Sequence, residues 1–188
     1  MTSPLRLGIA GIGTVGVGVI RIVQRHADLL AARCGRPIQI TAVSARDRSR
    51  DRGVRLGEYA WEDDAVALAR RDDVDVFVEL IGGDDGPAKA AVEAAIAAGK
   101  DVVTANKALL AHHGQALAEA AEGAGGVLRF EAAVAGGIPC IKALTESLAG
   151  NEITRVMGVM NGTCNYILTR MESAGLTYDA VFQEASDL

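Results

Sequence analysis

Three glycines near the start of the chain have the spacing of a loop that binds phosphate groups. Gly11, Gly13 and Gly16 form the pattern G-x-G-x-x-G between an apolar run and a segment with helical periodicity. In such a unit the first glycine permits a tight turn, the second lets the backbone approach a pyrophosphate, and the third lets helix and strand pack closely. Free N–H groups and the helix dipole favour an anion there. The segment predicts a dinucleotide site; the alternative is a structural turn.

The segment after the second apolar strand is rich in arginine. Five of the chain's 15 arginines lie within residues 46–55, although the net charge of the chain is −5. At this place an acidic residue binds the ribose 2′-hydroxyl of NAD, whereas arginine accommodates the 2′-phosphate of NADP. Arg46 is the best candidate for that contact, so the loop favours NADP. NAD stays open because Asp47 and Asp51 lie in the same loop, and a solvated charged loop is the alternative.

Two further loops follow apolar strands and could lie beside the reacting end of a cofactor. Gly82 and Gly83 follow the strand at 73–80, and paired glycines let the backbone approach a flat ring. Lys107, one of four lysines, follows the strand at 101–104. A lysine there could polarise a carbonyl oxygen or hold a carboxylate. The alternative is an ordinary surface lysine.

A fourth stretch, residues 130–139, is rich in glycine and contains one acidic side chain, Glu131. Its backbone carbonyls, together with the Glu131 carboxylate, could bind a small cation. The alternative is a glycine-rich turn between a strand and a helix.

Strands and helices alternate along the chain in a way that would bring these loops together. The expected strands cover residues 5–10, 39–44, 73–80, 101–104 and 127–133. The expected helices cover residues 14–35, 87–98, 114–122 and 138–148. This alternation predicts an α/β fold of Rossmann type, a doubly wound parallel sheet with helices on both faces. Ligands of such sheets bind at the carboxyl ends of the strands.

The pattern changes after residue 150, which suggests two domains. Residues 1–150 form the expected dinucleotide-binding domain. Residues 151–188 begin with an expected strand at 153–160, followed by a loop at 161–163 and a helix. This is the expected start of a second, α+β substrate domain.

Composition limits the class of protein further. The chain has 188 residues, 49% of them hydrophobic, which is enough for a sizeable core. Its negative net charge argues against a general nucleic-acid binder, and no apolar run is long enough to span a membrane. The cysteines, Cys34, Cys140 and Cys164, are scattered and odd in number, which favours reduced thiols in a cytoplasmic protein over disulfides or a zinc site.

Five motifs taken together resemble the homoserine dehydrogenase family, with a match from residue 5 to residue 188. The motifs are Gly-Ile-Gly-Thr-Val-Gly, Val-Glu-Leu-Ile-Gly-Gly, Val-Thr-Ala-Asn-Lys-Ala-Leu-Leu-Ala, Phe-Glu-Ala-Ala-Val-Ala-Gly-Gly-Ile-Pro and Val-Met-Asn-Gly-Thr-Cys-Asn-Tyr-Ile-Leu. The resemblance implies reversible hydride transfer between NAD(P)H and aspartate 4-semialdehyde. The product would be L-homoserine, a small molecule on the way to threonine and methionine.

The resemblance also implies roles for individual residues. The cofactor would be bound by Gly11, Gly13, Thr14, Val15, Gly16, Arg46, Gly82, Gly83 and Lys107. A sodium or potassium ion would be bound by Glu131, Val134, Gly136 and Ile138. The substrate loop would be Asn161, Gly162 and Thr163. Lys107 would support catalysis, while Cys164 is expected to be a packed thiol because no base accompanies it.

In the family the principal catalytic lysine and aspartate are expected to follow residue 188, as is most of the substrate domain of a homodimer. The chain is therefore expected to bind cofactor without efficient turnover. Two other classes remain open. One is another Rossmann oxidoreductase, such as a semialdehyde dehydrogenase, which would need a nucleophilic cysteine motif. The other is a non-catalytic dinucleotide-binding module.

Overall fold

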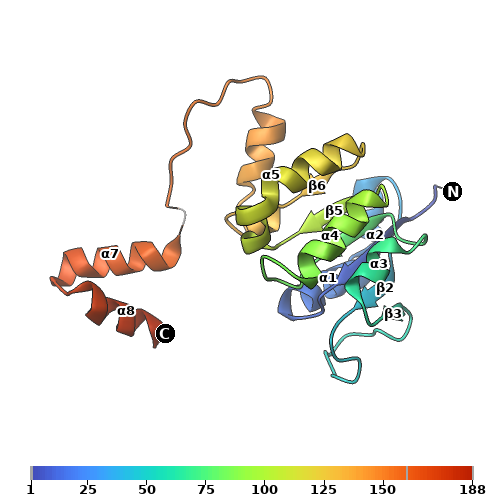
Figure 1. Ribbon diagram of the computed structural model, residues 1–188, viewed down its shortest axis with the longest axis horizontal. Coiled ribbons are helices and arrows are strands. Elements are labelled where there is room, and N and C mark those ends of the chain that lie inside the picture. The colour runs from blue at the N-terminus through green and yellow to red at the C-terminus, as the bar shows by residue number, and fades with distance from the viewer. Residues whose placement is uncertain (1, 160, 188) are drawn as a thin grey trace. The chain divides into compact units, whose positions relative to one another are not determined.

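The computed structural model describes residues 2–159 and 161–187, and it divides the chain into two compact units. The larger unit ends at Ala143 and the smaller begins at Leu144, a few residues before the domain boundary predicted from the sequence. The larger unit carries the sheet and the loops at its carboxyl edge (Figure 1).

The larger unit is built on one parallel sheet of six strands in the order β3-β2-β1-β4-β5-β6. The strands are β1 (Leu5–Ala10), β2 (Ile38–Ser44), β3 (Ala60–Glu62), β4 (Val76–Glu79), β5 (Asp101–Thr104) and β6 (Leu128–Arg129). The register places Ala10 of β1 beside Ser44 of β2 and Glu79 of β4, and Glu79 beside Thr104 of β5. The carboxyl ends of four strands therefore meet at one edge, and this strand order is that of dinucleotide-binding folds.

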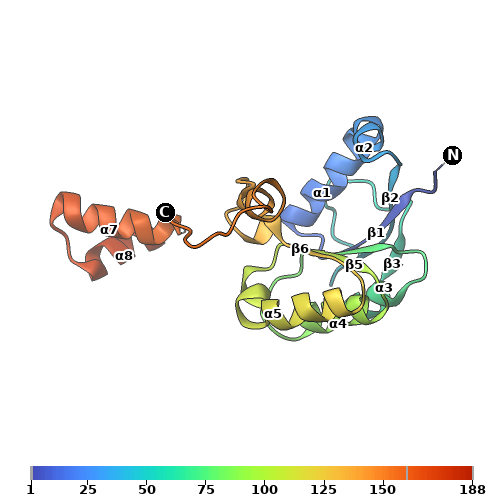
Figure 2. The same ribbon diagram turned by 90° about the horizontal axis from the view of Figure 1, so that it is seen from above.

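Helices cover both faces of the sheet, as predicted. They are α1 (Thr14–Arg25), α2 (Ala27–Cys34), α3 (Ala65–Arg70), α4 (Pro87–Ala97) and α5 (Lys107–Gly123). Figure 2 shows α1 and α2 on one face and α3, α4 and α5 on the other. The alternation of side chains in β4 serves both layers, because Phe77 packs in the cluster with α3, α4 and α5 while Val76 and Val78 pack in the cluster with α1.

Several predicted boundaries were wrong. The long first helix is broken at His26 into α1 and α2. Helix α5 begins at Lys107 and not at residue 114, because the Asn106 side chain caps it by accepting a hydrogen bond from the backbone N–H of Leu109. The strand predicted for 127–133 is only β6, and a 3₁₀ turn, η1 (Glu131–Ala133), follows it.

The elements on either side of residue 150 also differ from the prediction. The helix predicted for 138–148 consists of α6 (Cys140–Lys142) and a π-helical turn, η2 (Ala143–Ser147). No strand forms over residues 153–159, and Met160, the last residue of that predicted strand, lies outside the described residues. A strand needs a paired neighbour, and within the described ranges no strand pairs with this segment, whose Met157 and Val159 side chains are exposed.

The smaller unit contains a pair of helices, α7 (Gly162–Ala174) and α8 (Tyr178–Ser186). Asn161 caps α7, since its Oδ1 accepts a hydrogen bond from the backbone N–H of Cys164 at 2.9 Å. The Glu184 carboxylate of α8 accepts hydrogen bonds from the Tyr166 hydroxyl at 2.7 Å and from the Arg170 guanidinium. These bonds fasten the two helices together.

None of the helices in the described ranges is both long and apolar enough to cross a bilayer.

Candidate functional site

A cavity of about 660 Å³ lies at the carboxyl ends of β1, β2 and β4, which is the edge where the sequence placed a ligand. Its size is within the range of small-molecule and cofactor sites. Four loops contribute to it. The lining residues are Gly11, Ile12, Gly13, Ser44, Ala45, Arg46, Asp47, Arg50, Arg52, Asp63, Asp64, Ala65, Leu80, Ile81, Gly82, Gly83, Asp85 and Pro87.

The three glycines of the first loop have different structural reasons to be glycine. Gly11 has a φ of +94°, and a Cβ there would overlap the carbonyl group of Leu80. A Cβ on Gly16 would overlap the carbonyl oxygen of Gly11, so this glycine lets α1 lie against the loop. A Cβ on Gly13 would meet no atom within 4 Å, although Gly13 lines the cavity. Packing therefore requires Gly11 and Gly16, whereas Gly13 leaves room for a ligand.

Helix α1 starts immediately after Gly13 and has no acidic residue in its first turn. The backbone N–H groups of Thr14 and Val15 belong to that turn, where α-helical N–H groups have no partner within the helix. These two residues and Gly16 are not part of the cavity lining. Their N–H groups and the helix dipole favour an anion at the mouth of the loop.

The arginine loop is held by one of its own side chains, Arg52. Its Nε donates to the carbonyl oxygen of Ile12 at 3.0 Å, and its terminal nitrogens donate to those of Arg50 at 2.8 Å and Asp47 at 2.6 Å. The guanidinium also lies 5.8 Å from the centre of the Trp61 ring. Arg52 therefore ties the arginine loop to the glycine loop.

Arg46 and Arg50 also line the cavity and are exposed. Within residues 2–159 and 161–187, neither guanidinium has a hydrogen bond or an ion pair with a side chain or carbonyl. Two planar cations without a protein partner on one cavity wall suit a phosphate group, which guanidinium binds through paired N–H donors.

The acidic residues around the cavity have local partners. The Asp47 carboxylate accepts hydrogen bonds from the hydroxyl and backbone N–H of Ser49, and these bonds lower the pKa of Asp47. Asp63 accepts a hydrogen bond from the Trp61 indole at 2.9 Å. Asp64 caps α3 by accepting hydrogen bonds from two backbone N–H groups. These carboxylates stabilise the loops, and Asp47, one of the two acids that kept NAD open in the sequence, is bonded to Ser49.

The loop after β4 is organised around Glu79, which is completely buried. Its Oε1 accepts hydrogen bonds from the backbone N–H groups of Ile81 at 2.7 Å and Gly82 at 3.1 Å. Its Oε2 accepts one from the Thr104 hydroxyl at 2.5 Å. Gly83 is held in turn by Asn106, whose side-chain N–H donates to its carbonyl oxygen at 2.6 Å. Gly82 and Gly83, the loop predicted to lie beside a flat ring, are thus held by hydrogen bonds to Glu79 and Asn106.

Lys107 is the first residue of α5, directly after Asn106, and its side chain is exposed. It does not belong to the cavity lining, so the structure brings it to the same edge of the sheet without placing it on the cavity wall. The hydrogen bond between Asn106 and Gly83 connects the start of α5 to the lining.

The predicted cation-binding segment has its acidic side chain committed to the backbone. The Glu131 carboxylate accepts hydrogen bonds from the backbone N–H groups of Ile141 at 3.1 Å and Lys142 at 2.8 Å. The carbonyl oxygen of Ile138 accepts one bond, from the Cys140 N–H, and keeps a second lone pair. Oxygen ligands are present in the turn, and an ion would have to share the carboxylate with those two N–H groups.

The predicted substrate loop, Asn161, Gly162 and Thr163, belongs to the smaller unit at the start of α7. Asn161 is the helix cap described above. The prediction that Cys164 is a packed thiol was wrong, because its side chain is exposed at the start of this helix. Each of the two units is compact by itself, and the substrate role of these residues stays a prediction.

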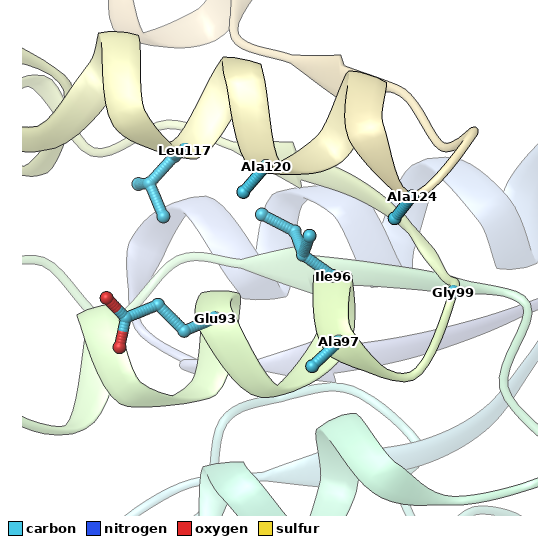
Figure 3. A pocket seen from close by; sticks show the side chains of 7 residues that line it. All are labelled: Glu93, Ile96, Ala97, Gly99, Leu117, Ala120 and Ala124. Carbon is cyan, nitrogen blue, oxygen red and sulfur yellow. The ribbon is translucent and has the colours of Figure 1, made fainter.

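A second hollow, about 410 Å³ in volume, lies between α4 and α5 (Figure 3). Alkyl side chains, the turn glycine Gly99 and a single carboxylate, that of Glu93, line it, so its lining offers no cation to a phosphate. The candidate site is therefore the cavity at the carboxyl edge.

The sequence did not predict several residues that build this cavity. Arg50 and Arg52 are in the arginine run that drew attention to Arg46, but their roles depend on the three-dimensional course of the loop. Glu79 was visible as a lone carboxylate in an otherwise apolar strand, which is a signal of a buried, hydrogen-bonded acid. Asn106 could have been found as a helix cap.

Strand order and a glycine loop at the switch point between β1 and β4 define a Rossmann-type, dinucleotide-binding α/β protein. Comparison with family models identifies the family within this class. The model of the homoserine dehydrogenase NAD-binding domain matches residues 11–131, and the homoserine dehydrogenase model matches residues 139–188. The chain belongs to the homoserine dehydrogenase family.

Curated relatives agree over nearly the whole chain. The homoserine dehydrogenase of Corynebacterium glutamicum is 47% identical over 186 residues, and that of Mycobacterium tuberculosis is 46% identical over 186 residues. Both alignments cover 99% of this chain, but only 41% and 42% of the respective relatives. The chain therefore spans about 42% of the length of such relatives.

Solved structures show the same fold. The homoserine dehydrogenase of Thiobacillus denitrificans is 40% identical with a TM-score of 0.86, covering 98% of this chain and 42% of that one. A hyperthermophilic archaeal homoserine dehydrogenase in complex with NADPH is 25% identical with a TM-score of 0.79. This alignment covers 98% of this chain and 61% of that one.

Proposed function

We propose that the chain binds NADP(H) in the cavity at the carboxyl edge, as the cofactor-binding part of a homoserine dehydrogenase. The observation that carries this proposal is the pair of unpartnered guanidiniums, Arg46 and Arg50, on the cavity wall after β2. A 2′-phosphate would give both cations a bidentate partner, whereas the 2′-hydroxyl of NAD would leave them unpaired. The archaeal relative in complex with NADPH supports the choice.

The rest of the cavity suits the remaining parts of a dinucleotide. The space beside Gly13 and the first turn of α1 fit a diphosphate, which accepts hydrogen bonds from the N–H groups of Thr14 and Val15. The loop of Gly82 and Gly83 would lie beside the nicotinamide ring. NADP(H), when bound, supplies the hydride.

The activity proposed for the longest gene product that contains the chain, called the longer protein below, is the interconversion of aspartate 4-semialdehyde and L-homoserine, on the way to threonine and methionine. Negative charge grows on the aldehyde oxygen as hydride reaches the carbonyl carbon, and a cation or donor nearby lowers that barrier. Lys107 has an exposed ammonium on the cofactor edge and can stabilise this charge. The loop of Asn161, Gly162 and Thr163 would bind the substrate.

Binding of a sodium or potassium ion by Glu131, Val134, Gly136 and Ile138 is a separate part of the proposal. Carboxylate and carbonyl oxygens are the ligands that hard cations prefer. Crystals soaked in thallium(I), an electron-rich substitute for potassium, should show an anomalous peak beside the Glu131 carboxylate. A map without such a peak would show that no such ion binds at this turn.

Assembly and location are proposed from the resemblance. We expect the longer protein to be a cytoplasmic homodimer with no nucleic-acid or membrane partner, which sedimentation and cell fractionation would test. The thiols of Cys34, Cys140 and Cys164 are all free, in keeping with a reducing compartment.

The proposed activity is tested by homoserine-dependent reduction of NADP, followed by the absorbance of the reduced nicotinamide. Binding is measured on the 188-residue chain, and turnover on both this chain and the longest gene product that contains it. We expect binding by the chain and turnover by the longest gene product that contains it. Absence of homoserine oxidation by the longer protein would refute the proposed activity while leaving the binding result intact.

A further inference from the structure

Glu79 is a completely buried carboxylate whose hydrogen-bond donors are neutral groups. Within the described ranges no lysine, arginine or histidine forms an ion pair with it. An isolated charge in an apolar layer is costly, so such a group is kept only where hydrogen bonds compensate it. Glu79 has three donors, the Ile81 and Gly82 N–H groups and the Thr104 hydroxyl.

These bonds continue into a closed ring that joins two loops. The Thr104 hydroxyl, while donating to Glu79, accepts a hydrogen bond from the Asn106 backbone N–H at 3.0 Å. The Asn106 side chain then donates to the carbonyl oxygen of Gly83 at 2.6 Å, and its Oδ1 caps α5. The ring therefore runs from Glu79 through residues 81–83, the Gly82 loop, to Asn106 and back through Thr104.

Ile81 packs its side chain against the core, but no side chain holds the two glycines that follow it. Gly82 and Gly83 both have positive φ, +85° and +87°, and a Cβ built on Gly82 would meet no atom within 4 Å. Glycines in open space have many alternative conformations. The hydrogen bonds to Glu79 and Asn106 are thus the main restraint on Gly82 and Gly83.

We propose that Glu79 is a positioning residue: through the Gly82 loop, Thr104 and Asn106 it preorganises the wall for the nicotinamide half of the cofactor and fixes the start of α5. This inference rests on the proposed cofactor binding. Preorganisation raises affinity because the loop does not have to be ordered when the ligand binds. The adenosine half, held by the arginine loop, should not depend on this ring.

The test compares two ligands on the 188-residue chain: NADPH, and adenosine 2′,5′-bisphosphate, which lacks the nicotinamide half. The central variant is Thr104→Val, which keeps the shape of the side chain and removes the hydroxyl. Thr104→Ser is its matched control, because it keeps the hydroxyl. Thr104→Val removes both hydrogen bonds of the hydroxyl, the one to Glu79 and the one from the Asn106 N–H. We expect it to weaken NADPH binding by about tenfold or more, since a single hydrogen bond to a charged group is already of that scale, and to leave the affinity for the bisphosphate unchanged. Thr104→Ser should bind both as the wild type does.

A second variant covers the case in which Thr104→Val fails to fold. Glu79→Gln keeps one oxygen for the Ile81 and Gly82 N–H groups but presents an amide to the Thr104 hydroxyl. Hydrogen exchange of the Gly82 N–H should become faster in this variant, in parallel with weaker NADPH binding. Unchanged exchange and affinity would overturn the positioning role.

The outcomes separate this inference from the proposed function. A wild-type chain that binds neither ligand refutes cofactor binding itself. A wild-type chain that binds both, with Thr104→Val equally good for NADPH, refutes only the role of the ring. Equal losses for both ligands in Thr104→Val would show a general structural effect and would also contradict the inference.

Discussion

The Nε of Arg52 donates a hydrogen bond to the carbonyl oxygen of Ile12 at 3.0 Å, which makes one continuous wall from the arginine loop and the glycine loop. The two loops are 40 residues apart in sequence. Arg52 therefore couples the loop that would hold the diphosphate to the loop that would hold the 2′-phosphate. Its own hydrogen bonds all go to backbone carbonyl oxygens. Arg52 shapes the site, whereas Arg46 and Arg50 remain available to a ligand.

Arg52→Ala should loosen both loops, because three carbonyl oxygens lose a charged donor. We expect the free energy of unfolding to fall by about 2 kcal/mol and the affinity for NADPH to fall with it. Arg52→Lys is the control that keeps the charge but offers a compact ammonium in place of the fork, and it should recover only part of the loss. Chemical denaturation and fluorescence titration measure the two quantities. Equal stability of the wild type, Arg52→Ala and Arg52→Lys would contradict this role of Arg52.

The glycines of the first loop should separate folding from binding. Gly13→Ala adds a Cβ in open space and should change the free energy of unfolding by about 1 kcal/mol or less, while NADPH affinity drops sharply because the methyl group enters the diphosphate space. Gly16→Ala overlaps the Gly11 carbonyl and should cost about 1–3 kcal/mol of stability. A Gly13→Ala chain with wild-type affinity would place the diphosphate elsewhere.

The sequence predicted the part of this fold that depends on local patterns. Apolar periodicity and glycine spacing gave the first strand, the glycine loop and the start of α1, because each element is encoded within a few neighbouring residues. The helix at α4 was also predicted closely, since Pro87 begins it and Gly99 follows its end. The arrangement of the parallel sheet followed from the alternation of these elements.

What the sequence did not predict depends on distant contacts or very short elements. Strand β3 and helix α3 have too few residues to show a period. The hydrogen bonds that the Glu131 carboxylate accepts from the N–H groups of Ile141 and Lys142 join residues ten and eleven positions apart, through a turn that no local rule describes. The strand expected near residue 153 did not form over the described residues, because strand propensity alone cannot supply a hydrogen-bonded neighbour.

Lys107→Ala should leave the fold intact, because the side chain is exposed at the start of α5. In the longest gene product that contains the chain, kcat/KM for homoserine should fall by about a hundredfold, the effect of losing one group that stabilises a developing oxyanion. Lys107→Arg keeps the positive charge and should retain more of the activity. An unimpaired Lys107→Ala enzyme would remove this residue from the active site.

The ion pair at the opposite end of the sheet should make stability depend on acid pH. The Asp75 carboxylate accepts hydrogen bonds from the Arg6 backbone N–H and from its guanidinium, and these bonds hold the pKa of Asp75 below its ordinary value of 3.8. Their contribution is complete above that value and is lost as the pH falls through the lower pKa of the folded state. Asp75→Asn should lower Tm by a few degrees at neutral pH.

Asp75→Asn should differ from the wild type only at pH values where the Asp75 carboxylate is charged. Below the folded-state pKa the wild-type carboxyl is protonated, so the difference in Tm between wild type and Asp75→Asn should vanish. Calorimetry across the acid range measures it. A difference that stays constant with pH would show that the ion pair does not contribute through its charge.

The central claim is that the unpartnered arginines after β2 select NADP(H), and a parallel titration of the chain with NADPH and NADH tests it most directly. We expect the wild-type chain to bind NADPH at least about tenfold more tightly than NADH, the scale of a charged hydrogen bond. Arg46→Ala should abolish most of that preference by weakening NADPH alone, and Arg33→Ala, an exposed arginine on α2, should leave it unchanged. Tighter binding of NADH by the wild-type chain, or an Arg46→Ala chain that prefers NADPH as strongly as the wild type, would contradict it.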